Sequence, residues 1–183
     1  GLNSGKNLAY LKSKNDGYIV SQKIRGMSKT FINEVLSEEG YACNAKGTFK
    51  IKSFLRDRET KDENGEKVIL KEKVVCFWSK DFDDREKHKR EKLEERITAY
   101  LESPSKLKSS NSYGIKKYLK LQNIDTETGE IEDIEPYVEF DEEKYKRDVS
   151  LDGYYTIVTS ELDLSNEDII KKYRCLWKIE ESF

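Results

Sequence analysis

The sequence lacks several features on which common enzymes and membrane proteins depend. It has one histidine, His88, so neither a Ser-His-Asp nor a Cys-His nucleophile system can form within the chain, and a zinc site is equally disfavoured. No apolar run approaches the roughly 18 residues of a membrane span, and no signal-peptide pattern opens the chain. Any catalysis would therefore depend on carboxylates.

Cysteine and net positive charge are scarce too. Cys43, Cys76 and Cys175 are odd in number and lack metal-ligand spacing, so we expect reduced core thiols of a cytosolic protein. The net charge is −2 although 38% of the residues are charged. This excludes a uniformly basic nucleic-acid binder but permits separate basic patches.

What the sequence does contain is a clear succession of helix and strand signals. Asn64-Gly65 is a strong hairpin turn signal between two strand-like runs, and Ser28 and Ser165 are typical helix N-caps. We expect helices within 3–17, 28–40, 80–102 and 141–148 and from Ser165 onward, and strands at 18–24, 48–59, 67–79, 117–124, 130–139 and 154–160. The fold class is therefore α+β, with a β-rich, charged middle between a helix–strand start and a strand–helix end.

Basic residues gather in three places. They lie on one face of the strand at 48–59 (Lys50, Lys52, Arg56 and Arg58), along the helix at 80–102, and in residues 104–121, which hold five lysines and no acid. Each group is either a solvated surface or a nucleic-acid contact. Residues 123–143 hold ten acids and no base, which either keep this part of the protein off DNA or meet a basic surface of another subunit.

The last helix carries a carboxylate on its apolar face. Ile169, Tyr173, Leu176, Glu180 and Phe183 are spaced by four, three, four and three residues, which puts them on one side of a helix. Burying an unpaired carboxylate costs several kcal/mol. Glu180 therefore either reaches solvent or a lysine at the edge of this face, or serves as a metal-binding or catalytic group.

The segment "DGYYTIVTSELDLSNEDIIKKYRCLWKIEESF" resembles the region around the catalytic glutamate of DDE transposases from bacterial insertion sequences. It is most similar to insertion-sequence family four, which has a tyrosine–arginine–glutamate–lysine signature. The tyrosine of that signature precedes the glutamate by seven residues, as Tyr173 precedes Glu180. "GLNSGKNLAYLKSKNDGYIVSQKI" is similar to the segment after the second catalytic aspartate, and "FWSKDFDDREKHKREKLEE" is similar to a helix between the two.

The resemblance implies a ribonuclease-H-like core in which a largely β insertion domain and a long charged helix precede the glutamate. It divides the chain into core residues 1–25, an insertion domain at 26–152, and core residues 153–183. It assigns Glu180 as a catalytic ligand of Mg²⁺ or Mn²⁺, with two aspartates upstream of Gly1. With one of three carboxylates, this chain is expected to be inactive by itself and to bind the metal weakly.

By the same resemblance, Tyr173 contacts a DNA phosphate near the cleaved end. The further residues expected to contact DNA are all basic: Lys23, Arg25, Lys106, Lys108, Lys116, Lys117, Arg174 and Lys178. The expected partners are transposon ends and target DNA, bound by a homodimer of the full-length enzyme in the bacterial cytoplasm.

The chain departs from the family signature in two places. Leu176 stands at the position of the signature arginine, and Arg174 is out of register with it. The signature lysine would lie beyond Phe183. A second possibility is therefore a non-enzymatic module that binds nucleic acid or protein and in which Glu180 is incidental.

Overall fold

The computed structural model describes residues 2–102, 114–122 and 137–180, and for 120–122, 137–138 and 176–180 it describes the backbone alone. The elements are α1 (Gly5–Ser13), β1 (Ile19–Gln22), α2 (Lys29–Leu36), β2 (Ala42–Cys43), β3 (Phe49–Lys61), β4 (Lys67–Ser79), α3 (Lys80–Glu102), η3 (Lys116–Tyr118), β5 (Leu119–Gln122), β6 (Tyr137–Phe140), α4 (Glu142–Val149), β7 (Tyr154–Thr159) and α5 (Asn166–Glu180). The predicted α+β class is confirmed.

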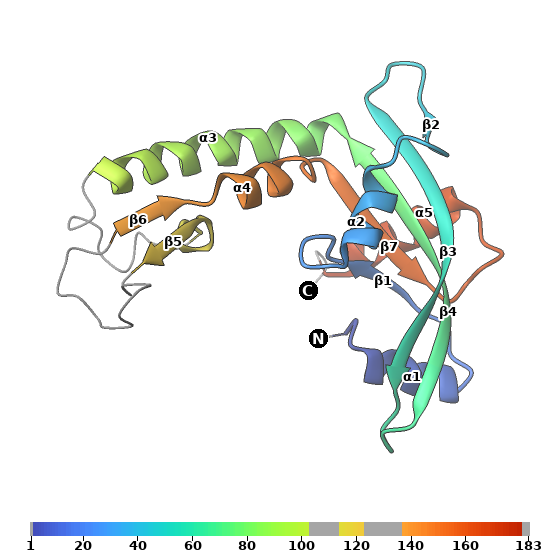
Figure 1. The fold of residues 1–183 in the computed structure, drawn as a ribbon. Coiled ribbons are helices and arrows are strands. Elements are labelled where there is room, and N and C mark those ends of the chain that lie inside the picture. The colour runs from blue at the N-terminus through green and yellow to red at the C-terminus, as the bar shows by residue number, and fades with distance from the viewer. Residues whose placement is uncertain (1, 103–113, 123–136, 181–183) are drawn as a thin grey trace. The chain divides into compact units, whose positions relative to one another are not determined.

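The chain forms two compact units (Figure 1). The first contains residues 1–83 and 153–183, and the second contains residues 84–152. The predicted division of the chain into core and insertion domain at residues 25 and 152 stays a prediction.

The first unit is built on an antiparallel sheet of five strands in the order β1-β7-β4-β3-β2. The strands β3 and β4 form the predicted hairpin, whose register runs from Phe49 opposite Ser79 to Lys61 opposite Lys67. Gly65 in its turn has a φ of +84°, a conformation that glycine adopts without strain. Because β7 pairs with both β1 and β4, segments from the start, middle and end of the chain share one sheet.

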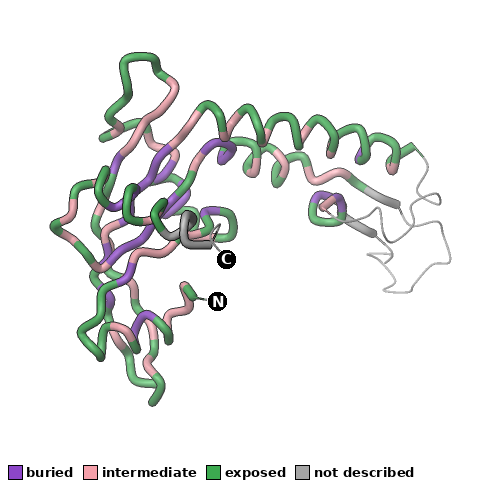
Figure 2. The backbone as a smooth tube through the Cα atoms, turned by 180° about the vertical axis from the view of Figure 1, so that it is seen from behind, coloured by how far each residue is buried: buried purple, intermediate pink, exposed green. Residues whose placement is uncertain are grey.

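One face of this sheet is covered by α5 (Figure 2). Its core contains Val75 and Phe77 of β4, Ile157 of β7, and Ile169 and Ile170 of α5, all buried. Tyr173, one helical turn beyond Ile169, packs against the same core. The predicted apolar face of the last helix is therefore correct as far as Tyr173.

The opposite face lies against α1 and α2, and the expectation of a solvated basic surface on β3 is wrong for Lys52. Lys52 is 4% exposed, and its ammonium donates hydrogen bonds to the carbonyl oxygens of Glu34, Ser37 and Glu39. A cation at this place satisfies carbonyls left open at the end of α2. The four basic residues do share one face, and the end of α2 buries Lys52, whereas the side chains of Lys50, Arg56 and Arg58 are 14%, 15% and 24% exposed. A nucleic-acid contact on this face stays a prediction.

The N-caps predicted at Ser28 and Ser165 are confirmed, and Ser4 caps α1 in the same way. Ser4 and Ser28 each accept a hydrogen bond from the backbone three residues on, at 3.3 and 3.2 Å. Ser165 accepts one from the backbone N–H of Asp168 at 3.1 Å and donates its hydroxyl to the Asp168 carboxylate at 2.7 Å. Ser165 and Asp168 thus form a capping pair at the start of α5.

The second unit contains most of α3, with η3, β5, β6 and α4. Its small core is formed by Ile97, Ile115 and Tyr118, with Leu93 and Tyr145 packed against it. The strands predicted near 117–124 and 130–139 correspond to β5 and β6, which pair Leu119 with Phe140. The first part of the second predicted strand lies outside the described residues.

The cysteines are free, as predicted, but only one of them belongs to the core. Cys76 is buried in β4, whereas Cys43 and Cys175 are exposed. Burial raises the pKa of the Cys76 thiol to about 12, because an apolar surrounding disfavours the thiolate. No helix in the described part of the chain is long and apolar enough to cross a membrane.

Candidate functional site

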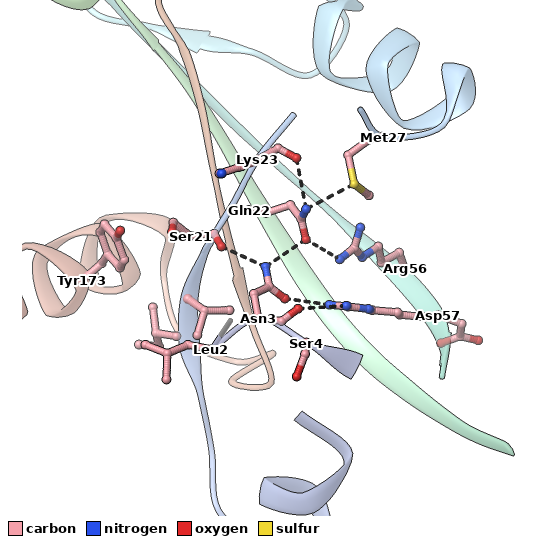
Figure 3. Close-up of a pocket in the computed structure, with 13 residues that line it drawn as sticks. Leu2, Asn3, Ser4, Ser21, Gln22, Lys23, Met27, Arg56, Asp57 and Tyr173 are labelled. Atoms are coloured by element: carbon pink, nitrogen blue, oxygen red, sulfur yellow. Dashed lines mark hydrogen bonds between the residues drawn. The ribbon is translucent and has the colours of Figure 1, made fainter. Parts of the chain in front are cut away.

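A cavity of about 740 Å³ lies beside β1 in the first unit (Figure 3). The lining residues come from the N-terminal segment, β1 and the turn after it, β3, and α5: Leu2, Asn3, Ser4, Ile19, Val20, Ser21, Gln22, Lys23, Met27, Arg56, Asp57, Arg58 and Tyr173. Four of these thirteen residues are of a charged type: Lys23, Arg56 and Arg58 are basic, and Asp57 is acidic.

The cavity follows the edge of the sheet. Among the described strands β1 is the outermost at one edge of the sheet, and β7 is the one strand that pairs with it. Side chains alternate between the two faces of a strand, and the lining includes Ser21 from one face and Gln22 from the other. Tyr173 and Arg56 lie on opposite sides of β1 (Figure 3), so the cavity extends around the strand edge.

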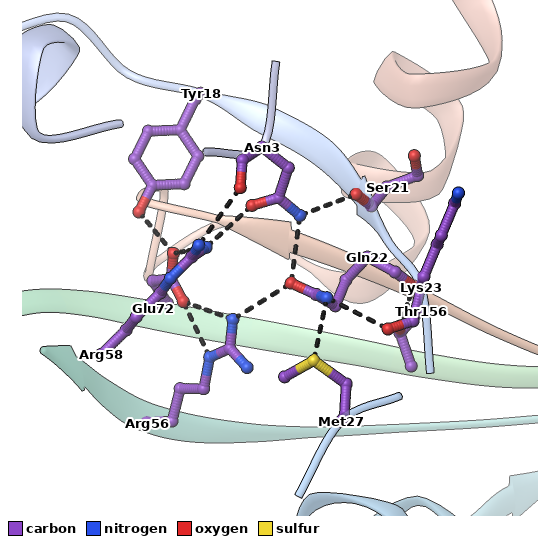
Figure 4. A network of polar contacts seen from close by, with 10 residues as sticks. All are labelled: Asn3, Tyr18, Ser21, Gln22, Lys23, Met27, Arg56, Arg58, Glu72 and Thr156. Atoms are coloured by element: carbon purple, nitrogen blue, oxygen red, sulfur yellow. Dashed lines mark hydrogen bonds and ion pairs between the residues drawn. The ribbon is translucent and has the colours of Figure 1, made fainter. Parts of the chain in front are cut away.

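Beneath the cavity, the carboxylate of Glu72 is completely buried (0% exposed) and held by three side chains (Figure 4). The Nε of Arg56 donates to it at 2.7 Å, its Nη2 lies 2.7 Å from the same oxygen, and Nη1 of Arg58 lies 3.7 Å from the other oxygen. The hydroxyl of Tyr18 donates to Glu72 at 2.8 Å. Burial and this hydrogen bond raise the pKa of Tyr18 well above its usual value, so the phenol stays protonated.

Asn3 and Gln22 connect this cluster to the strand edge. The amide of Asn3 donates to the carbonyl oxygen of Ser21 at 2.9 Å and to Oε1 of Gln22 at 3.0 Å. Arg58 donates to the side chain and the backbone carbonyl of Asn3 at 2.8 and 3.1 Å. These bonds position the segment before α1 along the outer side of β1, where it lines the cavity.

Some polar groups of the cavity have no hydrogen-bond partner among the described residues. They are Nη1 of Arg56, the ammonium of Lys23 and the hydroxyl of Tyr173. Arg56 directs Nε and Nη2 toward Glu72 and Gln22, and its side chain is 15% exposed. Cationic donors at a cavity wall suit an anionic ligand.

The structure brings some of the sequence-predicted site residues together. Tyr173 and Lys23, which are 150 positions apart, both line the cavity. Arg174 and Arg25 are exposed in the same unit but do not line it.

The remaining predicted residues are either in the second unit or outside the described residues. Lys116 and Lys117 are exposed in the second unit, where Lys117 pairs with Asp148 at 2.9 Å. Lys106 and Lys108 lie outside the described residues. The backbone of Lys178 and Glu180 is helical, but their side chains lie outside what the structure describes.

Sequence reasoning missed the central role of Glu72. Its signal was present: in "KVILKEKVVCFWS" the acid has the same parity as the buried Leu70 and Val74, and the register puts it opposite Arg56. An inward acid opposite an arginine predicts a buried pair only when strand pairing is known. Asn3 and Gln22 carried no signal in the sequence.

The described residues form no complete metal site. Among the described residues, no group of three or more His, Cys, Asp or Glu side chains is arranged to hold a metal ion. Asp152, an acid near the last strand, binds Arg90 through both of its oxygens. We therefore derive no chemical step through a metal ion.

Comparisons of the chain with protein-family models, with curated proteins and with solved structures give no match in any of the three.

Proposed function

We propose that this chain is part of a DDE transposase of a bacterial insertion sequence, an enzyme that cleaves and joins DNA strands at the ends of the element with Mg²⁺ or Mn²⁺. The observation that carries the proposal is that Tyr173 and Lys23 line one cavity. The first was selected by its spacing to Glu180 and the second by its position at a strand end. Their meeting supports a common DNA-binding groove.

The proposal includes the fold that the resemblance implies, a ribonuclease-H-like core interrupted by an insertion at 26–152. The pairing of β1 with β7, from Ile19 opposite Thr159 to Gln22 opposite Thr156, supports the part of this proposal in which the two ends of the chain meet. Helix α5 then follows β7 and carries Glu180 at its last position. The homodimer on DNA and the bacterial cytoplasm belong to the same proposal.

In this proposal each residue has a distinct task. Tyr173 donates its hydroxyl to a phosphate oxygen, and Lys23 neutralises phosphate charge at the same groove. Glu180 is a ligand of the metal ion, together with two aspartates upstream of Gly1. Carboxylate oxygens are the ligands that Mg²⁺ prefers. The chain by itself supplies one of the three and is expected to be inactive.

The first experiment is to sequence the source locus on both sides of these codons. We expect an aspartate codon close before residue 1 and a lysine codon in signature register beyond Phe183. The parent protein is then tested for Mg²⁺-dependent nicking of DNA that carries the element's end. Glu180→Gln should abolish nicking, whereas Glu181→Gln, a matched change at the next residue, should retain it.

Two results would contradict the proposal. One is a start codon at residue 1 with a stop codon after Phe183. The other is nicking by the parent protein that survives Glu180→Gln. Either result favours the second candidate, a non-enzymatic binding module. That candidate is supported by the cavity itself, because its cationic donors, Arg56 and Lys23, do not depend on Glu180.

A further inference from the structure

We infer that the cavity beside β1 binds a single strand of DNA, with its phosphates at Lys23 and Arg56. The identity of this ligand rests on the proposed function, but the site is assigned from the cavity alone. Neither the signature nor the comparisons assign Arg56, Arg58 or Glu72 a role in binding.

The first argument is that the arginines are prepared for a ligand. Glu72 is fully buried and binds Nε and Nη2 of Arg56, which leaves Nη1 without a partner among the described residues. Arg58 is held in turn by Asn3 at 2.8 Å. Side chains that are already ordered lose little conformational entropy when they bind, so their hydrogen bonds contribute more to affinity.

The second argument is charge. Among the described residues, the cavity wall carries Lys23, Arg56 and Arg58 as cations and Asp57 as the one acid, and Glu72 lies beneath it. Counting all five, the site has a net charge of +1. One surplus positive charge favours a phosphodiester, which carries one negative charge, over a free phosphate, which carries nearly two.

The third argument is the shape and chemistry of the wall. The cavity follows the whole of β1, four residues or roughly 13 Å at about 3.3 Å per residue, which is longer than one phosphate group. Leu2, Ile19 and Met27 contribute apolar groups to the wall. A groove that offers cations to the backbone and apolar surface to the bases is typical of single-strand binding, because a duplex keeps its bases stacked inside.

The test is a binding titration of the folded chain with a fluorescent single-stranded oligonucleotide, the matching duplex, and inorganic phosphate as competitor. Lys23→Gln removes an exposed cation that has no partner among the described residues, so it should leave the fold intact. Arg56→Gln is combined with Glu72→Gln, which avoids a buried unpaired carboxylate. Lys67→Gln, at an exposed position away from the cavity, is the matched control. Thermal unfolding of each variant shows whether it folds.

We expect Lys23→Gln and the double variant each to weaken single-strand binding by about tenfold, the usual value of a lost charge-assisted hydrogen bond. Duplex binding should change by less, and Lys67→Gln should change neither by more than about twofold. Asp57→Asn, which removes the only acid of the wall, should strengthen single-strand binding by about threefold, because like-charge repulsion with the phosphates is lost.

The possible failures are distinct. If DNA binds but Lys23→Gln and Lys67→Gln have equal effects, or the duplex binds more tightly than the single strand, the inference is wrong and the proposed function is untouched. If inorganic phosphate binds at the cavity and DNA does not, the ligand is a free anion and the inference is also wrong. If the parent protein nicks no DNA while the cavity variants behave as expected, the proposed function fails and the single-strand site remains.

Discussion

Each compact unit contains a buried carboxylate bound by an arginine, and the two clusters differ in what the arginine has left to donate. In the second unit, Arg90 uses all three guanidinium nitrogens: Nε and Nη2 bind Asp152, and Nη1 donates to the hydroxyl of Tyr118 at 3.2 Å. In the first unit, Arg56 binds Glu72 and Gln22 through Nε and Nη2, and Nη1 has no partner among the described residues.

The number of remaining donors therefore distinguishes a structural ion pair from one that is prepared for binding. Both carboxylates are buried, with side chains 2% and 0% exposed, so burial alone does not distinguish them. The deciding observation is whether donors remain beside a cavity. The contacts of Asp152 with Arg90 make it part of the second unit's own cluster.

The largest expected effect is on the Arg90–Asp152 cluster, which we call closed because all three guanidinium nitrogens of Arg90 have partners. Arg90→Gln leaves the Asp152 carboxylate without the guanidinium that binds both of its oxygens, and we expect the second unit to lose about 4 kcal/mol of unfolding free energy. Urea denaturation followed by circular dichroism measures it. Adding Asp152→Asn should recover roughly half of the loss, because the buried charge is removed. A loss below about 1 kcal/mol would contradict a closed, structural role.

A smaller loss of unfolding free energy is expected when Arg56 is replaced in the Arg56–Glu72 cluster, which we call open because Nη1 of Arg56 has no partner among the described residues. After Arg56→Gln, Glu72 still accepts a hydrogen bond from Tyr18 at 2.8 Å and lies 3.7 Å from Arg58. We therefore expect a loss of about 2 kcal/mol, measured by the same denaturation. Glu72→Gln in the same chain should reduce it. A loss of unfolding free energy equal to that of Arg90→Gln would contradict the distinction between the two clusters.

The smallest effect concerns pH and the first unit, because residues 84–152 contain no cysteine. The pKa of Cys76 is raised from 9.0 to about 12 by burial. The unfolded chain therefore releases this proton at lower pH than the folded chain, and stability falls as pH rises above 9. Between pH 9 and pH 10 we expect the unfolding free energy to fall by about 1 kcal/mol. Tyr18, with its pKa raised above its ordinary 10.0, contributes mainly above this window.

The control for the pH prediction is Cys76→Ala, which should make the fall between pH 9 and pH 10 shallower without changing the exposed Cys43 and Cys175. An equal fall in this variant would show that a different group causes it.

Much of the fold was predictable because its signals are local. Ser28 and Ser165 cap helices through bonds that span three residues, and Asn64-Gly65 closes a hairpin whose strands follow directly. The long helix at 80–102 ends where it was predicted to end. Two of the predicted DNA-contacting residues, Lys23 and Tyr173, do line one cavity. That they contact DNA stays a prediction.

The site itself was less predictable. The basic face of β3 was expected either to be solvated or to bind nucleic acid. The first expectation is wrong, because Lys52 is buried against the end of α2 and Arg56 binds Glu72. The second stays a prediction. These contacts depend on which helix covers which face, and no periodicity within β3 contains that information. The same reason explains Cys43, which was expected in the core and is exposed on a short edge strand.

By itself, then, the sequence determined the class of the fold, the order of its elements and their caps and turns. These depend on backbone preferences and hydrogen bonds that act over a few residues. Tertiary structure alone decided that β1 is an edge strand, that Glu72 meets Arg56 beneath a cavity, and that Asp152 is closed off by Arg90. Such contacts join residues 16 and 62 positions apart, and only packing of the whole sheet and its helices determines which charges are buried together and which still face a cavity.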